Sequence, residues 1–211
     1  MLEKKESKNK KRNKSQLMIV GSFLLIIIGF TMIGWKYYHQ YIMSKQEKEQ
    51  IEIYVQSHQE IIQEDKLEEL ESNDEQVQNK EEFVAILEIP KIELKKGIYS
   101  KDSPNNNVDK NIAILKESDM PDIPNGNFIL AGHSGTGYYA YFKNLKKLEK
   151  GDIAYIYYNA SKYKYVLVDK YEIDKTGKAL IVKNENDTAM TLITCKDNED
   201  KQLIFIFSKE G

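Results

Sequence analysis

The chain has 211 residues, of which 30% are charged, with a formal net charge of −2 and a single cysteine. This near-neutral balance gives no basic field of the kind that binds nucleic acid. One cysteine cannot form an internal disulfide, so the fold must depend on its core. The length leaves room for one globular domain with additional segments.

The first part of the sequence predicts a membrane anchor. Residues 1–16 carry seven Lys or Arg against two Glu, and the next nineteen residues, 17–35, have no charge. A helix of that length spans about 28 Å, close to the hydrocarbon thickness of a bilayer. Trp35 and Tyr37 follow, where a cleavable signal peptide would have a small-x-small site. We predict a single-pass cell-membrane protein, anchored by Leu17 to Trp35, with a cytoplasmic N-terminus and everything after residue 36 outside.

Residues 36–80 form a charged segment between the anchor and a domain over 81–211. Ile51, Tyr54, Ile61 and Ile62 recur at helical spacing among many acidic residues. We interpret this segment as a helical stalk and solvated linker, with a short coiled coil to a second copy as the alternative. His39 lies here without matching ligands, so we expect neither a metal nor a cofactor.

Short β-type runs begin at Phe83, separated by turn residues. Strands are expected at 83–89, 92–98, 112–115, 127–130, 153–158, 163–173, 179–182, 190–194 and 202–207. A hairpin is predicted at residues 159–161 and a short helix at 138–148. The pattern is typical of a mostly β protein, a closed barrel of about eight strands with one or two short helices.

Two strand ends carry a candidate catalytic pair. Cys195 ends the run Thr191-Leu192-Ile193-Thr194, and His133 follows the run that begins at Asn127. A thiolate beside an imidazolium is a nucleophile, and the imidazole can transfer protons. The alternatives are a buried, inert cysteine and a histidine that only shapes its loop. The glycines around His133 lack the following lysine of a phosphate-binding loop.

With these residues in place, the chain resembles the sortases, membrane-anchored cysteine transpeptidases of Gram-positive bacteria. The resemblance runs from about Phe83 to the C-terminus and rests on four segments: Leu87 to Ile92, Gly126 to Ser134, Phe142 to Leu145 with Gly151-Asp152, and Thr191 to Cys195. It implies that Cys195 is the nucleophile and His133 the general acid and base. The implied substrates are surface proteins with a C-terminal LPxTG-like sorting signal, cleaved between Thr and Gly through a thioacyl-enzyme, and a cell-wall precursor amine.

The sequence departs from the family at one position. Sortases carry an arginine on the strand after the cysteine, whereas the one arginine here is Arg12. Aligning the last apolar run places Gln202 at the arginine position, with Lys201 beside it on the opposite face of a regular strand. A glutamine donates N–H bonds without the charge that strengthens them. Either another donor such as Lys201 compensates, or the enzyme is slow or inactive.

Two other functions compete with a sortase. Papain-like peptidases place the cysteine before the histidine and on a helix, which is the reverse of the order here. A catalytically weak or inactive sortase-like module that binds peptides at the membrane is supported by the missing arginine. A pilus-assembly sortase is disfavoured, since the loop Lys101–Lys110 has Asp102 but no aromatic residue.

Overall fold

The computed structural model of the chain describes residues 3–63, 83–175, 187–196 and 200–210. The chain divides into two compact units, Met1–Gln50 and Ile51–Gly211. Helix α1 (Glu3–Gln63) is continuous and contains a segment, Gly21–Gln56, that is long and apolar enough to cross a membrane. The described N-terminal part is therefore consistent with a single membrane span.

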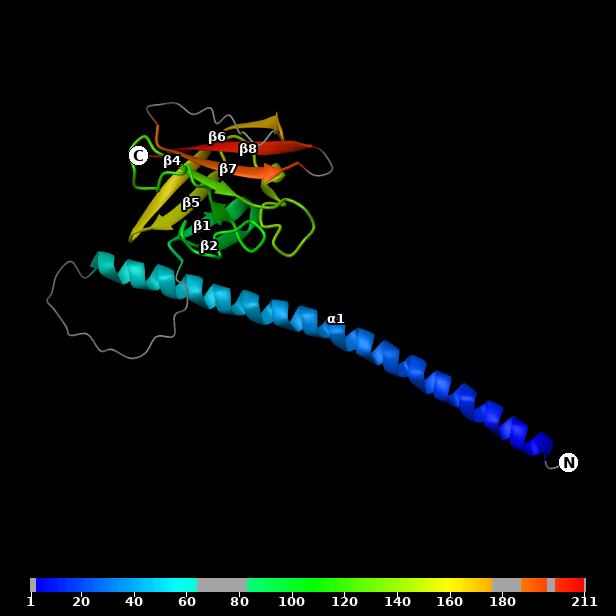
Figure 1. Cartoon of the computed structure of the whole chain (residues 1–211). Coiled ribbons are helices and arrows are strands. Elements are labelled where there is room, and N and C mark those ends of the chain that lie inside the picture. The colour runs from blue at the N-terminus through cyan, green and yellow to red at the C-terminus, as the bar shows by residue number, and fades with distance from the viewer. Residues whose placement is uncertain (1–2, 64–82, 176–186, 197–199, 211) are drawn as a thin grey trace. The chain divides into compact units, whose positions relative to one another are not determined.

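The second unit is built around one eight-stranded sheet. Its strands are β1 (Ala85–Ile89), β2 (Leu94–Ile98), β3 (Ala113–Ile114), β4 (Asn127–Ala131), β5 (Ile153–Tyr158), β6 (Ser161–Asp174), β7 (Ala189–Cys195) and β8 (Lys201–Lys209). Their order in the sheet is β2-β1-β5-β6-β8-β7-β4-β3, and every described pairing is antiparallel except that of β4 with β7. The predicted mostly β barrel is confirmed, and Figure 1 shows β7 beside β8.

The barrel is nearly closed, but no strand pairing between its two edge strands closes it in the described residues. β2 and β3 occupy the two ends of the strand order, and within the described ranges no pairing joins them. The buried amide of Asn111, just before β3, donates a hydrogen bond of 2.8 Å to the carbonyl oxygen of Gly97 on β2. A side chain thus bridges the two edges, which satisfies a backbone group that would otherwise be buried without a partner.

The sheet has an apolar cluster on each face. The inner core includes Leu87, Phe128, Leu192 and Phe205, with Leu203 packed against it. A second group, called here the outer cluster, consists of Ile129, Ile193, Ile204 and Ile206, with Leu115, Ala131, Tyr171 and Ile173 packed against it. Residues of β7 and β8 alternate between the two clusters, because successive side chains of a strand point to opposite faces.

The structure differs from the sequence prediction in its short helices. Instead of a helix over 138–148, only Leu145–Lys147 (η2) is helical, as a 3₁₀ turn, and a second 3₁₀ turn, η1, covers Pro90–Ile92. The amide of Phe142 donates to the carbonyl oxygen of His133 at 2.9 Å instead of to a helical neighbour. This bond ties the segment to the end of β4 and prevents a regular helix.

Other expected elements have mixed outcomes. The hairpin between β5 and β6 is confirmed, with Asn159 and Ala160 both at positive φ. The strand expected at 179–182 lies outside the described residues. Near the start of the barrel, Ile51 and Tyr54 of α1 are buried with Phe83, and the Tyr54 hydroxyl donates to the carbonyl oxygen of Val84 at 3.0 Å.

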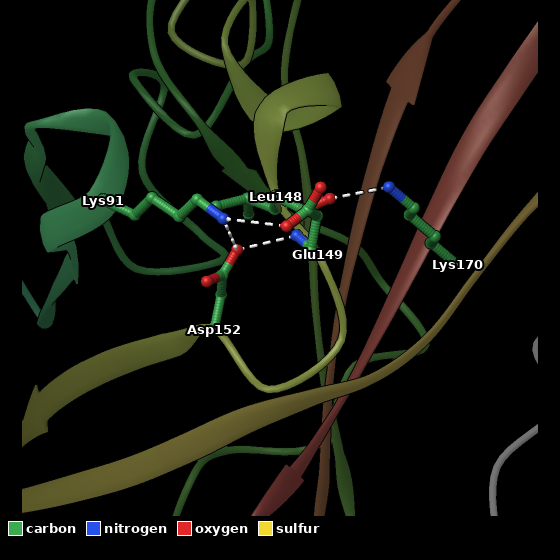
Figure 2. A network of polar contacts seen from close by, with 5 residues as sticks. All are labelled: Lys91, Leu148, Glu149, Asp152 and Lys170. Atoms are coloured by element: carbon green, nitrogen blue, oxygen red, sulfur yellow. Dashed lines mark hydrogen bonds and ion pairs between the residues drawn. The ribbon is translucent and has the colours of Figure 1, made fainter.

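A polar network, shown in Figure 2, fixes the turn before β5. Lys91 Nζ lies 2.8 Å from an Asp152 carboxylate oxygen, which also accepts the Glu149 amide at 2.6 Å. Burial raises the pKa of Asp152, but the hydrogen bonds from Lys91 and Glu149 outweigh it and hold that pKa below its usual value. Lys170 on β6 donates to the carbonyl oxygen of Leu148 at 2.7 Å. The network joins η1, η2 and β6 at one end of the barrel.

Candidate active site

The parallel pairing of β4 with β7 brings the two predicted site segments together. In this register Ala131 pairs with Ile193, and His133 and Cys195 stand two residues further along their chains. Because β4 and β7 run in the same direction, the C-terminal ends of these two strands lie at the same edge of the sheet. The structure therefore gathers His133 and Cys195 at one edge.

Three hydrogen bonds outside the strand pairing join the segment after β4 to the end of β7. The Gly132 amide donates to the carbonyl oxygen of Ile193 at 3.1 Å. The Thr194 hydroxyl donates to the carbonyl oxygen of Gly132 at 2.7 Å, and the buried Ser134 hydroxyl donates to the carbonyl oxygen of Cys195 at 2.5 Å. The residues on both sides of His133 are thus fixed to the end of β7, a role of Thr194 and Ser134 that sequence reasoning missed.

Gly132 is required by the close approach of an aromatic ring. A Cβ at this position would lie 2.9 Å from Cδ2 of Phe142, a buried residue of the inner core. Such a contact is too short for real carbon atoms, so a side chain here would displace either the ring or the backbone that carries His133. The glycine before the histidine therefore has a packing reason.

The imidazole of His133 contacts a carboxylate that the sequence did not single out. Its Nε2 atom lies 3.0 Å from Oδ1 of Asp109, with the histidine side chain 45% and the aspartate side chain 79% exposed. Asp109 belongs to the polar loop between β2 and β3, and its amide donates to Oδ1 of Asn107 at 2.9 Å. A loop residue carries no periodic signal, so only the acidic character of the loop hinted at this partner.

Gln202 lies directly opposite Cys195 in the antiparallel pairing of β7 with β8. Directly opposed residues of such a pair point to the same face. Cys195 is two residues after Ile193 and Gln202 two before Ile204, so both lie on the face of the outer cluster. The structure brings together the predicted nucleophile and the residue aligned with the family arginine.

Lys201 lies on the other face and is engaged elsewhere. Its Nζ atom is 3.6 Å from Oε2 of Glu172, and Nζ of Lys196 is 2.9 Å from Oε1 of the same carboxylate. The hydrogen bond from Lys196 holds the pKa of Glu172 below its usual value. Of the two neighbouring candidates, the geometry does not bring Lys201 to the face of Cys195.

Two cavities flank the end of β7. One of about 440 Å³ includes Cys195 in its wall, together with residues of β6, β8 and the segment after β4. The other, of about 310 Å³, contains His133 and Asp109 with residues of the glycine-rich segment that follows. Within the described ranges, no group of three His, Cys, Asp or Glu side chains is placed to hold a metal ion.

This arrangement has the parts of a cysteine acyl-transfer site. The partly exposed thiol of Cys195 lies at the end of β7. The imidazole of His133 follows the neighbouring strand β4, and the side-chain amide of Gln202 lies opposite Cys195 on β8. A thiolate can attack a carbonyl, an imidazole can exchange protons with the departing or attacking nitrogen, and an amide N–H can donate to a developing oxyanion. The buried outer cluster lies on the same face of the strands as the thiol.

Comparisons with known proteins agree with this reading of the fold. A family model described as the sortase domain matches residues 87–209. Sortase A of Bacillus anthracis is 26% identical over 202 residues, covering 91% of this chain and 94% of that protein. Sortase A of Staphylococcus aureus is 23% identical over 193 residues, covering 90% and 92%.

Solved structures show the same fold. Sortase C-1 of Actinomyces oris matches with a TM-score of 0.55 and 25% identity over 61% of this chain and 72% of that one. A sortase D5 transpeptidase of Clostridium perfringens matches with a TM-score of 0.55 and 21% identity over 79% and 95%. The family match covers most of the barrel, and the chain belongs to the sortase family of transpeptidases.

Proposed function

We propose that this protein cleaves an LPxTG-like sorting signal between Thr and Gly and transfers the cleaved protein to an amine of a cell-wall precursor. The observation that carries the proposal is the parallel pairing of β4 with β7, which sets His133 and Cys195 at one sheet edge. The cavity of about 440 Å³ supports it, because Cys195 lies in its wall beside Leu203, Ile204 and Phe205, an apolar lining that suits the Leu and Pro of such a signal.

In the first half of the reaction, the Cys195 thiolate attacks the threonine carbonyl carbon. Protonated His133 gives its proton to the glycine nitrogen as the C–N bond breaks, and the C-terminal fragment leaves. The amide of Gln202, on the same face as Cys195, donates a hydrogen bond to the oxyanion or to the peptide backbone. The product is a thioester between Cys195 and the threonine.

In the second half, an acceptor amine attacks the thioester carbonyl. His133 accepts the proton of the amine, a new amide bond forms, and the Cys195 thiolate leaves. The bond from Nε2 of His133 to Asp109 orients the imidazole from the side of the β2–β3 loop. Asp109 is thus a positioning residue in this proposal.

The protein acts at the cell membrane in this proposal. Leu17 to Trp35 would form the membrane span, with residues 1–16 in the cytoplasm and the barrel outside. The apolarity of the N-terminal helix supports the span, and the basic first sixteen residues support this orientation. Residues 36–80 would separate the span from the catalytic domain over 81–211.

The direct test is to detect the thioester. The full chain in a non-ionic detergent is incubated with a peptide that contains an LPxTG motif, and the intact mass is measured at low pH. We expect an increase equal to the mass of the peptide fragment that ends at threonine, less one water, which Cys195→Ala abolishes without loss of the barrel's β-type circular dichroism. Cleavage that persists in Cys195→Ala would show that the nucleophile lies elsewhere.

A second candidate function is a catalytically weak or inactive sortase-like module that binds sorting peptides at the membrane. Gln202, the neutral residue opposite Cys195, is the observation that favours it. This candidate predicts saturable binding of the peptide with no mass increase on the protein. This candidate would be excluded if Cys195 formed the thioester with the sorting peptide faster than free cysteine in solution reacts with the same peptide.

A further inference from the structure

The cavity of about 310 Å³ beside His133 shares no lining residue with the cavity that contains Cys195. The boundary between the two follows the chain after β4, where His133 lines the first cavity and Ser134 lines the second. The Ser134 hydroxyl donates to the carbonyl oxygen of Cys195, which fixes this boundary to the end of β7. The imidazole that exchanges protons in the proposed reaction therefore lines a space separate from that of the thiol.

The charge of the His133 cavity is acidic. Among the described residues that line it, Asp109 is the one carboxylate, and none is a lysine or an arginine. Oδ1 of Asp109 contacts Nε2 of His133, whereas Oδ2 accepts no hydrogen bond from the residues that the structure describes. The side chain is 79% exposed, so this second oxygen is open to a ligand. A carboxylate oxygen accepts charge-assisted hydrogen bonds from an ammonium group.

Aromatic rings form another part of the same wall. Tyr138 and Tyr139 are both exposed there, with ring centroids 4.8 Å apart at an interplanar angle of 69°. Tyr139 also contacts Tyr141 edge to face at 6.3 Å, and Nζ of the buried Lys96 lies 4.0 Å from the centroid of the Tyr141 ring. The ring of Tyr139 is thus held by its neighbours, and the face of a tyrosine ring attracts a cation.

Two glycines leave the cavity open. Gly135 and Gly137 line it, and a Cβ atom at either position would meet no other atom within 4 Å. Packing therefore does not require a glycine at either position, and the missing side chains leave room for a ligand near His133. A volume of about 310 Å³ lies at the lower end of the range for ligand pockets, which suits a slender chain.

We propose that this cavity is the subsite for the acceptor amine, which enters it as the ammonium form, a proposal that rests on the function proposed above. The carboxylate of Asp109 and the ring of Tyr139 bind the ammonium group next to His133. One proton of the ammonium passes to solvent before the attack on the thioester. His133 accepts a second proton as the amide bond forms and the Cys195 thiolate leaves.

The charge of the cavity also identifies the class of acceptor. His133 protonates the nitrogen that departs in the first half-reaction and deprotonates the nitrogen that attacks in the second, so the acceptor takes the place that the leaving fragment vacates. Asp109 attracts the ammonium group and repels an anion beside it. The acceptor is accordingly a primary amine that carries no carboxylate next to its nitrogen.

A kinetic test examines the aromatic wall. Preformed thioester on the full chain in non-ionic detergent is resolved with glycinamide, in the wild type and in two variants of Tyr139. Tyr139→Leu, which removes the ring, should raise KM for glycinamide about threefold, and Tyr139→Phe, which keeps the ring, should retain the KM of the wild type. Tyr155→Leu, on β5 and outside the cavity lining, is the control. An unchanged KM in Tyr139→Leu would overturn the role of the ring.

A second kinetic test examines the charge of the acceptor. Glycinamide is compared with glycine, whose carboxylate lies next to the amine. The two amines differ in basicity, so the informative quantity is the change in the ratio of their kcat/KM values between variants. Asp109→Asn keeps an oxygen acceptor for His133 but removes the charge, and should reduce the preference for glycinamide about threefold at low salt. Asp102→Asn, on the same loop, should retain it. A ratio that Asp109→Asn leaves unchanged would overturn the proposed acceptor class.

Binding can be tested without any catalytic step, which separates failure of this subsite from failure of the proposed function. The full-length Cys195→Ala variant, isotopically labelled at histidine Cε1, is titrated with glycinamide or with N-acetylglycinamide, which lacks the ammonium group. We expect glycinamide alone to shift the NMR signal of His133, while the signals of His39 and His58 report general effects of salt and pH. If glycinamide moved the His133 signal no more than an equal concentration of sodium chloride does, the subsite would be overturned, whether or not the enzyme is active.

Discussion

Cys195 on β7 and Gln202 on β8 are directly opposed in the sheet and share one face, while Lys201 is paired with Glu172 on the other. The proposed site therefore has a neutral hydrogen-bond donor, Gln202, at the position where sortases have an arginine. If Gln202 donates to the oxyanion, Gln202→Ala should lower kcat/KM by roughly 10²-fold, and Lys201→Ala should have a much smaller effect.

The charge-restoring variant tests the same relationship in the opposite direction. Gln202→Arg should raise kcat/KM for a sorting peptide, because a guanidinium donates charge-assisted, bidentate hydrogen bonds. Lys201→Arg is the matched control on the neighbouring residue. A severe loss in Lys201→Ala with a silent Gln202→Ala would make Lys201 the donor.

The contact between His133 and Asp109 leads to a second prediction. Asp109→Ala should lower kcat/KM roughly tenfold, because an imidazole without this partner samples orientations that do not face the substrate. Asp109→Asn keeps an oxygen acceptor and should recover part of the loss. Asp102→Ala, on the same loop, serves as the control. An increase in activity in Asp109→Ala would show that the carboxylate holds His133 in an inactive position.

The Lys91–Asp152 pair predicts how stability depends on pH. Because the fold lowers the pKa of Asp152, this carboxylate contributes stability above the pKa of about 4 that it has when unfolded. That contribution is lost as the pH falls through the lower pKa of the folded state. Asp152→Asn should cost about 1 kcal/mol at pH 7 and flatten the decline below pH 4. Thermal unfolding followed by tyrosine near-ultraviolet circular dichroism measures both. If the stability of Asp152→Asn fell below pH 4 as steeply as that of the wild type, this role of Asp152 would be contradicted.

The membrane topology gives a prediction that can be tested in cells. If residues 1–16 remain in the cytoplasm, protease added to intact protoplasts should remove the barrel and leave a short membrane-bound N-terminal fragment. A cytoplasmic protein probed in the same sample shows that the protoplasts stayed sealed. Complete protection of the barrel in sealed protoplasts, with digestion after lysis, would reverse the proposed orientation.

Local sequence patterns determined much of the fold. β5 was predicted with its observed bounds, and the turn at Asn159 was confirmed, because alternation and turn chemistry are local properties. The helix expected at 138–148 was wrong for a tertiary reason. The Phe142 amide bonds to the end of β4, a partner far enough away in sequence that no local pattern reveals it.

For the candidate site, the sequence alone singled out Cys195 and His133, since each follows an apolar run at a strand end and both fit a family pattern. The face on which Gln202 stands depends on the register of β7 against β8, where a slip of one residue exchanges it with Lys201. Asp109 reaches His133 through the path of a loop, and the wall of the cavity beside Cys195 is assembled from β6, β7, β8 and the segment after β4. Such convergence of distant residues is decided by tertiary packing, because hydrogen bonds and charge act through space and leave no period in the chain.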